Sequence, residues 1–266
     1  MKKYLYLNLI LAFTIINFTP SIGQSAKKEH KSAMTSGTVS IVDIDGIIIE
    51  GYTGSEVIVS SMVEESEENE RSKGLKVLNS LGLDDNTGFG VSVYKEGDIL
   101  YVKNVSNSCD CDVVTIKVPQ SVNISVEHGN YNAEALIVRN VSSELEITTN
   151  YHEVRLEDVT GPMAVKTVYG SIDAIFSQLS QEGSVSLYSV YELVDVTIPK
   201  SSKMNVSLSA PNGNVYSNVN VDITSNKKDS HGSGHGGSTI VGTTNGGGVD
   251  FNVKSAYEDV YLRYGN

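Results

Sequence analysis

The sequence predicts an all-β protein, and in more detail a β-solenoid, or parallel β-helix, with coils of about 20 residues. Tyrosines recur at predicted corners of the chain, Tyr131, Tyr151, Tyr169 and Tyr191, at intervals of 20, 18 and 22 residues. Short runs of alternating apolar and polar residues follow each corner, as in half-buried strands. The apolar residues are mostly Val, Ile and Leu, and no helical period is sustained. A β-sandwich is the alternative fold.

In a repeat architecture, each unit buries its apolar face by stacking on its neighbours. Neighbouring coils then lie about 4.8 Å apart, so the four corner tyrosines should form a row. We interpret this row mainly as a packing ladder. The alternative is an exposed aromatic stripe that binds glycans, which makes Tyr131, Tyr151, Tyr169 and Tyr191 the candidate ligand-binding residues. The predicted inward positions are Leu136, Val138, Leu145, Ile147, Val154, Leu156, Val165, Ile172, Val185, Leu187, Val194, Val196, Val206 and Leu208.

Residues 1–24 have the pattern of a secretory signal peptide: Lys2 and Lys3 precede an apolar run, and small and polar residues follow it. We therefore expect an extracytoplasmic protein, in the periplasm, on the outer surface or released, with no integral membrane segment in the mature chain. Residues 25–36 are polar and are predicted to be a flexible lead-in. Residues 37–266 are predicted to be a single domain with loop insertions near 62–88 and 225–247.

The formal net charge is −12, and removal of the signal peptide with its two lysines makes it −14. Such a surface repels phosphate backbones, which argues against a nucleic-acid partner. Glycans and envelope or surface proteins remain as possible partners, and the sequence does not indicate an oligomeric state.

We predict no catalytic residue, no metal site and no cofactor. The segment His152–Asp158 holds the best cluster of acid and base groups, and we interpret it as a charge ladder on a solvated face. The alternative is the site of a polysaccharide lyase or hydrolase. His231 and His235 lie in a Gly/Ser-rich loop. Cys109 and Cys111 are expected to form a local disulfide or to remain free thiols, since they lack enough neighbouring ligands for zinc.

The corners and strands of YGSIDAIF (169–176) and NGNVYSNV (212–219) resemble the bacterial putative-adhesin domain family. Residues 81–105, with a turn and a hairpin, and residues 113–132, with a strand that enters the first repeat, resemble the same family. The resemblance covers most of residues 37–263. It implies right-handed β-helix-like repeats and an extracytoplasmic envelope or surface location, and it brings no catalytic residues.

These observations together predict a secreted, non-enzymatic envelope or cell-surface repeat protein that acts in adhesion or scaffolding through the faces of the solenoid. One alternative is a carbohydrate-active β-helix enzyme. Another alternative is a periplasmic accessory factor in envelope sensing.

Overall fold

The computed structural model describes residues 25–64, 71, 75, 79–105, 113–131, 134–228 and 238–265. These residues form strands and turns but no helix, which confirms the all-β prediction. The predicted signal peptide lies outside the described residues. The strands are β1 (Ser25–Ala33), β2 (Thr38–Val42), β3 (Ile47–Tyr52), β4 (Glu56–Glu64), β5 (Val91–Glu96), β6 (Ile99–Asn104), β7 (Val114–Pro119), β8 (Asn123–His128), β9 (Leu136–Arg139), β10 (Leu145–Thr149), β11 (Val154–Val159), β12 (Met163–Thr167), β13 (Ile172–Phe176), β14 (Val185–Ser189), β15 (Val194–Ile198), β16 (Met204–Ala210), β17 (Val215–Ser217), β18 (Asp222–Lys228), β19 (Ser238–Thr244), β20 (Val249–Ser255) and β21 (Val260–Tyr264).

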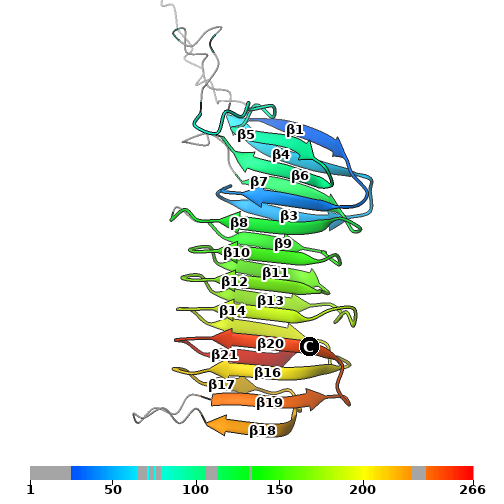
Figure 1. Cartoon of the computed structure of the whole chain (residues 1–266), viewed down its shortest axis with the longest axis vertical. Coiled ribbons are helices and arrows are strands. Elements are labelled where there is room, and N and C mark those ends of the chain that lie inside the picture. Colours follow the sequence, from blue (N-terminus) through cyan, green and yellow to red (C-terminus); the bar gives the residue numbers. More distant parts are fainter. Residues whose placement is uncertain are drawn as a thin grey trace, which may run out of the picture.

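The strands belong to two large mixed sheets, which form the elongated stack in Figure 1. The ten-stranded sheet has the order β1-β4-β7-β3-β9-β11-β13-β15-β21-β17. The eleven-stranded sheet has the order β18-β19-β16-β20-β14-β12-β10-β8-β2-β6-β5. We call a rung one strand of the eleven-stranded sheet together with the next strand along the chain in the other sheet, such as β10 with β11. Two large sheets are compatible with the sandwich alternative, and the solenoid stays a prediction.

Apolar side chains from both sheets form one core. Neighbouring rungs pair in parallel, and the register keeps Ile124, Leu145, Met163 and Val185 in line across four strands. Their residue numbers differ by 21, 18 and 22, close to the spacing of the tyrosines. Buried and exposed residues alternate along β10, as a strand with one solvated face requires. Every inward position predicted from the sequence is buried.

The rungs follow a different order in space from their order in the chain. β20 lies between β14 and β16, and β21 lies between β15 and β17, so the last rung fills a gap inside the stack. Residues 249–255 thus rejoin the stack between two earlier rungs and do not extend it beyond residues 215–217. Rungs with the same alternation offer equivalent edges for pairing, so adjacency in the sequence does not decide which rungs become neighbours.

The first rung, β2 with β3, is likewise enclosed, between the rung of β6 and β7 and the rung of β8 and β9. Antiparallel strands cover both sheets at one end of the stack, β4 and β1 on one sheet and β5 on the other. At the other end, β19 and β18 cover the eleven-stranded sheet, and the short parallel strand β17 ends the ten-stranded sheet. The added antiparallel strands shield the parallel strands next to them, since an exposed sheet edge readily pairs with other chains.

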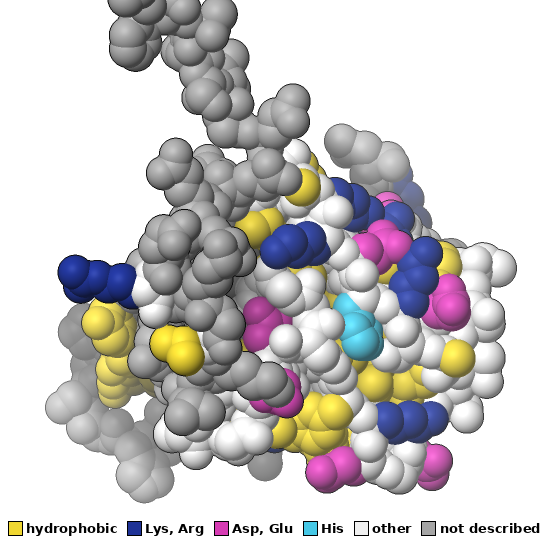
Figure 2. All heavy atoms as spheres, turned by 90° about the horizontal axis from the view of Figure 1, so that it is seen from above, with side chains coloured by type: hydrophobic (Ala, Val, Ile, Leu, Met, Phe, Trp, Pro, Cys, Tyr) yellow, Lys and Arg dark blue, Asp and Glu magenta, His cyan; other side chains and the backbone are white. Residues whose placement is uncertain are grey.

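Residues 25–33 are not the flexible lead-in that their polar composition predicted. They form β1, which pairs with β4 from Ser25 opposite Glu64 to Ala33 opposite Glu56. Polar and charged residues suit a strand at the edge of a sheet, because one side of such a strand has no neighbouring strand and faces water. Figure 2 shows basic, acidic and histidine side chains interspersed over the described part of this end of the molecule.

Strands reach into both segments that were predicted to be loop insertions. β4 extends to Glu64, inside the insertion predicted near 62–88. Most of the described part of 225–247 is the antiparallel hairpin of β18 and β19. The Asp85 carboxylate accepts hydrogen bonds from the backbone N–H groups of Thr87, Gly88 and Gly90, so this side chain closes the turn. The rest of both segments lies outside the described residues.

Candidate functional site

The corner tyrosines form a row of stacked rings whose members differ from the predicted four. Ring centroids lie 5.2 Å apart between Tyr151 and Tyr169, 4.9 Å between Tyr169 and Tyr191, and 4.9 Å between Tyr191 and Tyr257. The interplanar angles are 15°, 5° and 16°. Tyr131 is 78% exposed and has no aromatic partner within the described part of the chain. We call Tyr151, Tyr169, Tyr191 and Tyr257 the tyrosine ladder.

Buried hydroxyl groups hold the corners of the ladder in register. Ser189 Oγ donates to the backbone oxygen of Gly170 at 2.9 Å and accepts from the backbone nitrogen of Glu192 at 3.1 Å. Ser255 Oγ repeats the arrangement, with the backbone oxygen of Glu192 at 2.8 Å and the backbone nitrogen of Glu258 at 3.0 Å. Each hydroxyl thus links two rungs and satisfies backbone groups that the turn leaves without a partner in the sheet.

Sequence reasoning missed Tyr257, although a signal for it exists. Each ladder tyrosine comes two residues after a buried Ser or Thr, namely Thr149, Thr167, Ser189 and Ser255. Tyr131 follows Gly129 instead and lacks this residue. Asn212 lies at the next corner beyond Tyr257, where its Nδ2 donates to the backbone oxygen of Ala256 at 2.7 Å.

The ladder restricts the kind of ligand contact that it can make. Nearly parallel rings about one strand spacing apart cover each other's faces, and the faces are what a sugar ring would need for stacking. The rings are still 41–53% exposed, so their edges and phenol hydroxyls face solvent. A ligand of the ladder would therefore be contacted through hydroxyl groups and ring edges, or through the outer face of the first or last ring.

Two buried histidines lie beside the first ladder corner. The rings of His128 and His152 meet edge to face at a centroid distance of 4.0 Å. His128 Nε2 lies 2.9 Å from Asp45 Oδ1, and His152 Nδ1 is hydrogen-bonded to the backbone oxygen of Glu134. The other two ring nitrogens have no hydrogen-bond partner within the described structure. Burial lowers the pKa of His152, more than the hydrogen bond to Glu134 raises it.

The predicted charged cluster at His152–Asp158 is divided by the fold. His152 is 1% exposed and points into the interior, so it does not share the outer face with its neighbours. Arg155 Nε lies 2.8 Å from Glu153 Oε1. Arg139 Nε lies 2.7 Å from Glu157 Oε2 on the next rung, which is the cross-rung charge ladder we predicted. The histidine that the enzyme alternative needed on this face is absent from it, because the corner turns the ring toward His128.

Two aspartates continue this outer face of the ten-stranded sheet. The register places Asp173 beside Asp195, and Arg263 Nη2 lies 2.6 Å from Asp195 Oδ2. Partial burial, and then the neighbouring Asp195 charge, raises the pKa of Asp173. Partial burial also raises the pKa of Asp195, against the opposing effect of Arg263. Among the described residues, no three side chains of His, Cys, Asp or Glu are grouped so that they could hold a metal ion.

The outer face of the eleven-stranded sheet is polar and mostly uncharged near β14, β20 and β16. A shallow hollow of about 300 Å³ lies there, and the Nζ of Lys254 lies 5.2 Å from the ring centroid of Tyr188 beside it. The remaining exposed lining comes from small polar side chains, Ser186, Ser207, Ser209 and Asn252.

Several residues named in the sequence analysis lie outside the described part of the chain: Cys109, Cys111, His231 and His235. Within the described ranges, no helix has the length and apolar character needed to cross a membrane.

No protein-family model matches the sequence, and no curated protein matches it. A solved structure described as a "putative cell adhesion protein" from Clostridium sporogenes is 12% identical, with a TM-score of 0.45, and the match covers 90% of this chain and 100% of that one. A "putative adhesin" from Parabacteroides distasonis is 8% identical, with a TM-score of 0.27, and the match covers 91% of this chain and 98% of that one. At these scores neither likeness decides the fold or the function, and membership of the adhesin family stays a prediction.

Proposed function

We propose that this chain is an extracytoplasmic, non-enzymatic envelope or cell-surface protein, a right-handed solenoid that acts in adhesion or scaffolding through its outer faces. The observation that carries the proposal is the long, regular surface beside the tyrosine ladder, where rungs in register repeat polar and charged side chains. A surface of this kind offers many equivalent weak contacts to a repetitive partner such as a glycan or an envelope polymer.

The location part of the proposal rests on the signal-peptide pattern of residues 1–24. The acidic surface, with a formal net charge of −12, favours uncharged or basic partners over nucleic acid. His152 points into the interior, so the enzyme alternative would have to rely on the carboxylates and the arginine of the outer Glu153–Asp158 face.

The test is a pull-down of envelope fractions and immobilised glycans with the chain from residue 25 onward. We expect capture of at least one glycan or envelope polymer, and capture of none would overturn the proposed function. The double variant Tyr169→Phe/Tyr191→Phe serves as the matched probe of the ladder, because it keeps the stacked rings and removes two exposed hydroxyls. Reduced capture with unchanged stability would place binding on the ladder, and unchanged capture would place it on the sheet faces.

A further inference from the structure

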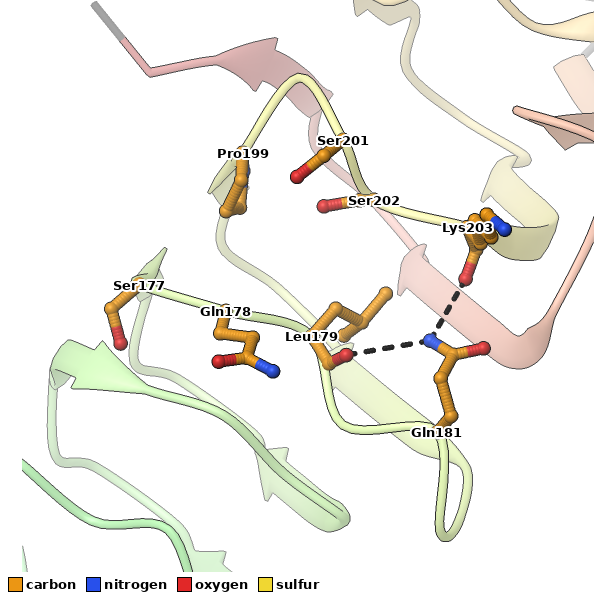
Figure 3. A pocket seen from close by; sticks show the side chains of 8 residues that line it. All are labelled: Ser177, Gln178, Leu179, Gln181, Pro199, Ser201, Ser202 and Lys203. Atoms are coloured by element: carbon orange, nitrogen blue, oxygen red, sulfur yellow. Dashed lines mark hydrogen bonds between the residues drawn. The ribbon is translucent and has the colours of Figure 1, made fainter.

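A pocket of about 370 Å³ lies on the edge of the stack where the chain passes from the ten-stranded sheet to the eleven-stranded sheet. Two connections form it: residues 177–184, between β13 and β14, and residues 199–203, between β15 and β16. Figure 3 shows the two connections facing each other across the pocket. Its volume is at the lower end of the range for small-molecule sites.

The inserted last rung explains why a pocket exists here. Because β20 lies between β14 and β16, the connection from β15 to β16 must pass one additional level of the stack. The gap is held open by protein contacts. Gln181 Nε2 donates to the backbone oxygen of Lys203 at 3.1 Å, and Gln181 Oε1 accepts from the backbone nitrogen of Val249 at 3.2 Å. A side chain at Gly248 would collide with both Gln181 Oε1 and the Lys203 carbonyl.

The residue that points to a ligand is Ser202. It is only 6% exposed, it lines the pocket, and its hydroxyl has no hydrogen-bond partner within the described structure. Its backbone is fixed, since Thr244 Oγ1 and Asn245 Nδ2 each donate to the Ser202 carbonyl at 2.9 Å. A buried hydroxyl without a partner is costly, so a molecule that enters the pocket and bonds with this hydroxyl would remove that cost.

The chemistry of the lining defines the class of that molecule. Ser201 and Ser202 project from one connection in Figure 3, and Ser177 and Gln178 belong to the other. Hydroxyl and amide groups can both donate and accept hydrogen bonds, which matches a ligand that carries several hydroxyls. Leu179 and Pro199 add apolar surface of the kind that the carbon face of a sugar contacts. Among the described residues, Lys203 is the only charged one in the lining, which favours a neutral ligand over a strongly charged one.

We propose that this pocket binds a single neutral sugar unit, with the Ser202 hydroxyl and the Gln178 amide as its main hydrogen-bonding groups. The inference rests on the proposed adhesive function for its biological role, because it identifies one ligand class of such a surface. The site is separate from the tyrosine ladder, since the ladder lies where the chain returns from the eleven-stranded sheet to the ten-stranded sheet.

The test is ligand-observed NMR with the chain from residue 25 onward and with glucose, galactose, mannose and N-acetylglucosamine as probes. We expect saturation transfer to at least one sugar, and a loss of affinity of about fivefold or more in Ser202→Ala and in Gln178→Ala. Ser186 lies in the shallow hollow on the outer face of the eleven-stranded sheet. Ser186→Ala is therefore the matched control and should keep the affinity. No transfer to any of the four sugars, or equal affinity in the Ser202 variant, would overturn the proposal.

Stability separates a binding role of Ser202 from a structural one. Because its hydroxyl has no partner in the free protein, Ser202→Ala should unfold at the same or a higher denaturant concentration. A lower midpoint would show that the hydroxyl supports the fold instead. If the sugars fail to bind while the envelope pull-down succeeds, the pocket proposal falls and the adhesive function stands. If the sugars bind while the pull-down fails, the adhesive function falls.

Discussion

Replacement of Tyr169 by alanine gives the sharpest test of the tyrosine ladder as a packing element. Tyr169 stacks on two neighbours, at 5.2 and 4.9 Å, and each such pair contributes about 0.5–1.5 kcal/mol beyond the area that it buries. We therefore expect Tyr169→Ala to lower the free energy of unfolding by about 1–3 kcal/mol through the lost stacking alone, with the lost apolar burial added to that. For a domain of this size that corresponds to a fall in Tm of about 2–4 °C for each kcal/mol, measurable by calorimetry or by denaturant unfolding.

Two control variants isolate the stacking contribution. Tyr131→Ala removes a tyrosine that is 78% exposed and outside the ladder, so it should change the free energy of unfolding by less than about 0.5 kcal/mol. Tyr169→Phe keeps the ring and should be close to neutral. Equal losses in Tyr169→Ala and Tyr131→Ala would refute the packing interpretation, and an equal loss in Tyr169→Phe would assign the effect to the hydroxyl.

Three further perturbations test the interior. Burial lowers the pKa of His152 below its ordinary value of about 6.5, so the unfolded chain takes up protons first as the pH falls, and the free energy of unfolding should decrease below that pH. Urea unfolding at about pH 7.5 and about pH 5.5 measures this, and an equal or higher stability at the lower pH would contradict it. Ser189→Ala leaves a buried backbone oxygen and a part-buried backbone N–H without a partner and should cost about 1–3 kcal/mol. The exposed Ser186→Ala on the same strand should cost almost nothing, and similar denaturant midpoints for the two variants would exclude a structural role for the Ser189 hydroxyl. Phe251 is fully buried in the inserted rung, so Phe251→Ala should cost about 3–5 kcal/mol in the same assay, and a loss near zero would mean that this rung is not part of the cooperative core.

The alternation of side chains made the core predictable. A strand with one solvated face must alternate, so residues such as Leu145, Ile147 and Val165 could be assigned to the interior from local sequence alone. The ladder was predictable in kind for the same reason, because a corner repeated about every 20 residues brings equivalent side chains together. Its membership was not, because Tyr257 is distant in sequence from Tyr191 and becomes its neighbour only through the inserted rung.

The histidine pair shows where local pattern fails. His152 is followed by Glu153, Arg155 and Glu157, and these charged neighbours suggested that His152 lies on the outer face with them. A corner residue does not follow the alternation of the strand after it, so the turn sets its direction. Here the turn points the ring at His128, which comes from another rung. The contact joins two segments that are separate in the chain, so the local sequence around either histidine does not predict it.

The sequence alone determined that the chain is all-β, which residues form its core, and that a tyrosine row follows its corners, since all three depend on short-range periodicity. Only the tertiary structure decided the order of the rungs, the strand that covers each end, and the pocket beside Ser202. These depend on which of several equivalent strand edges pair, and that choice depends on contacts between segments far apart in the chain.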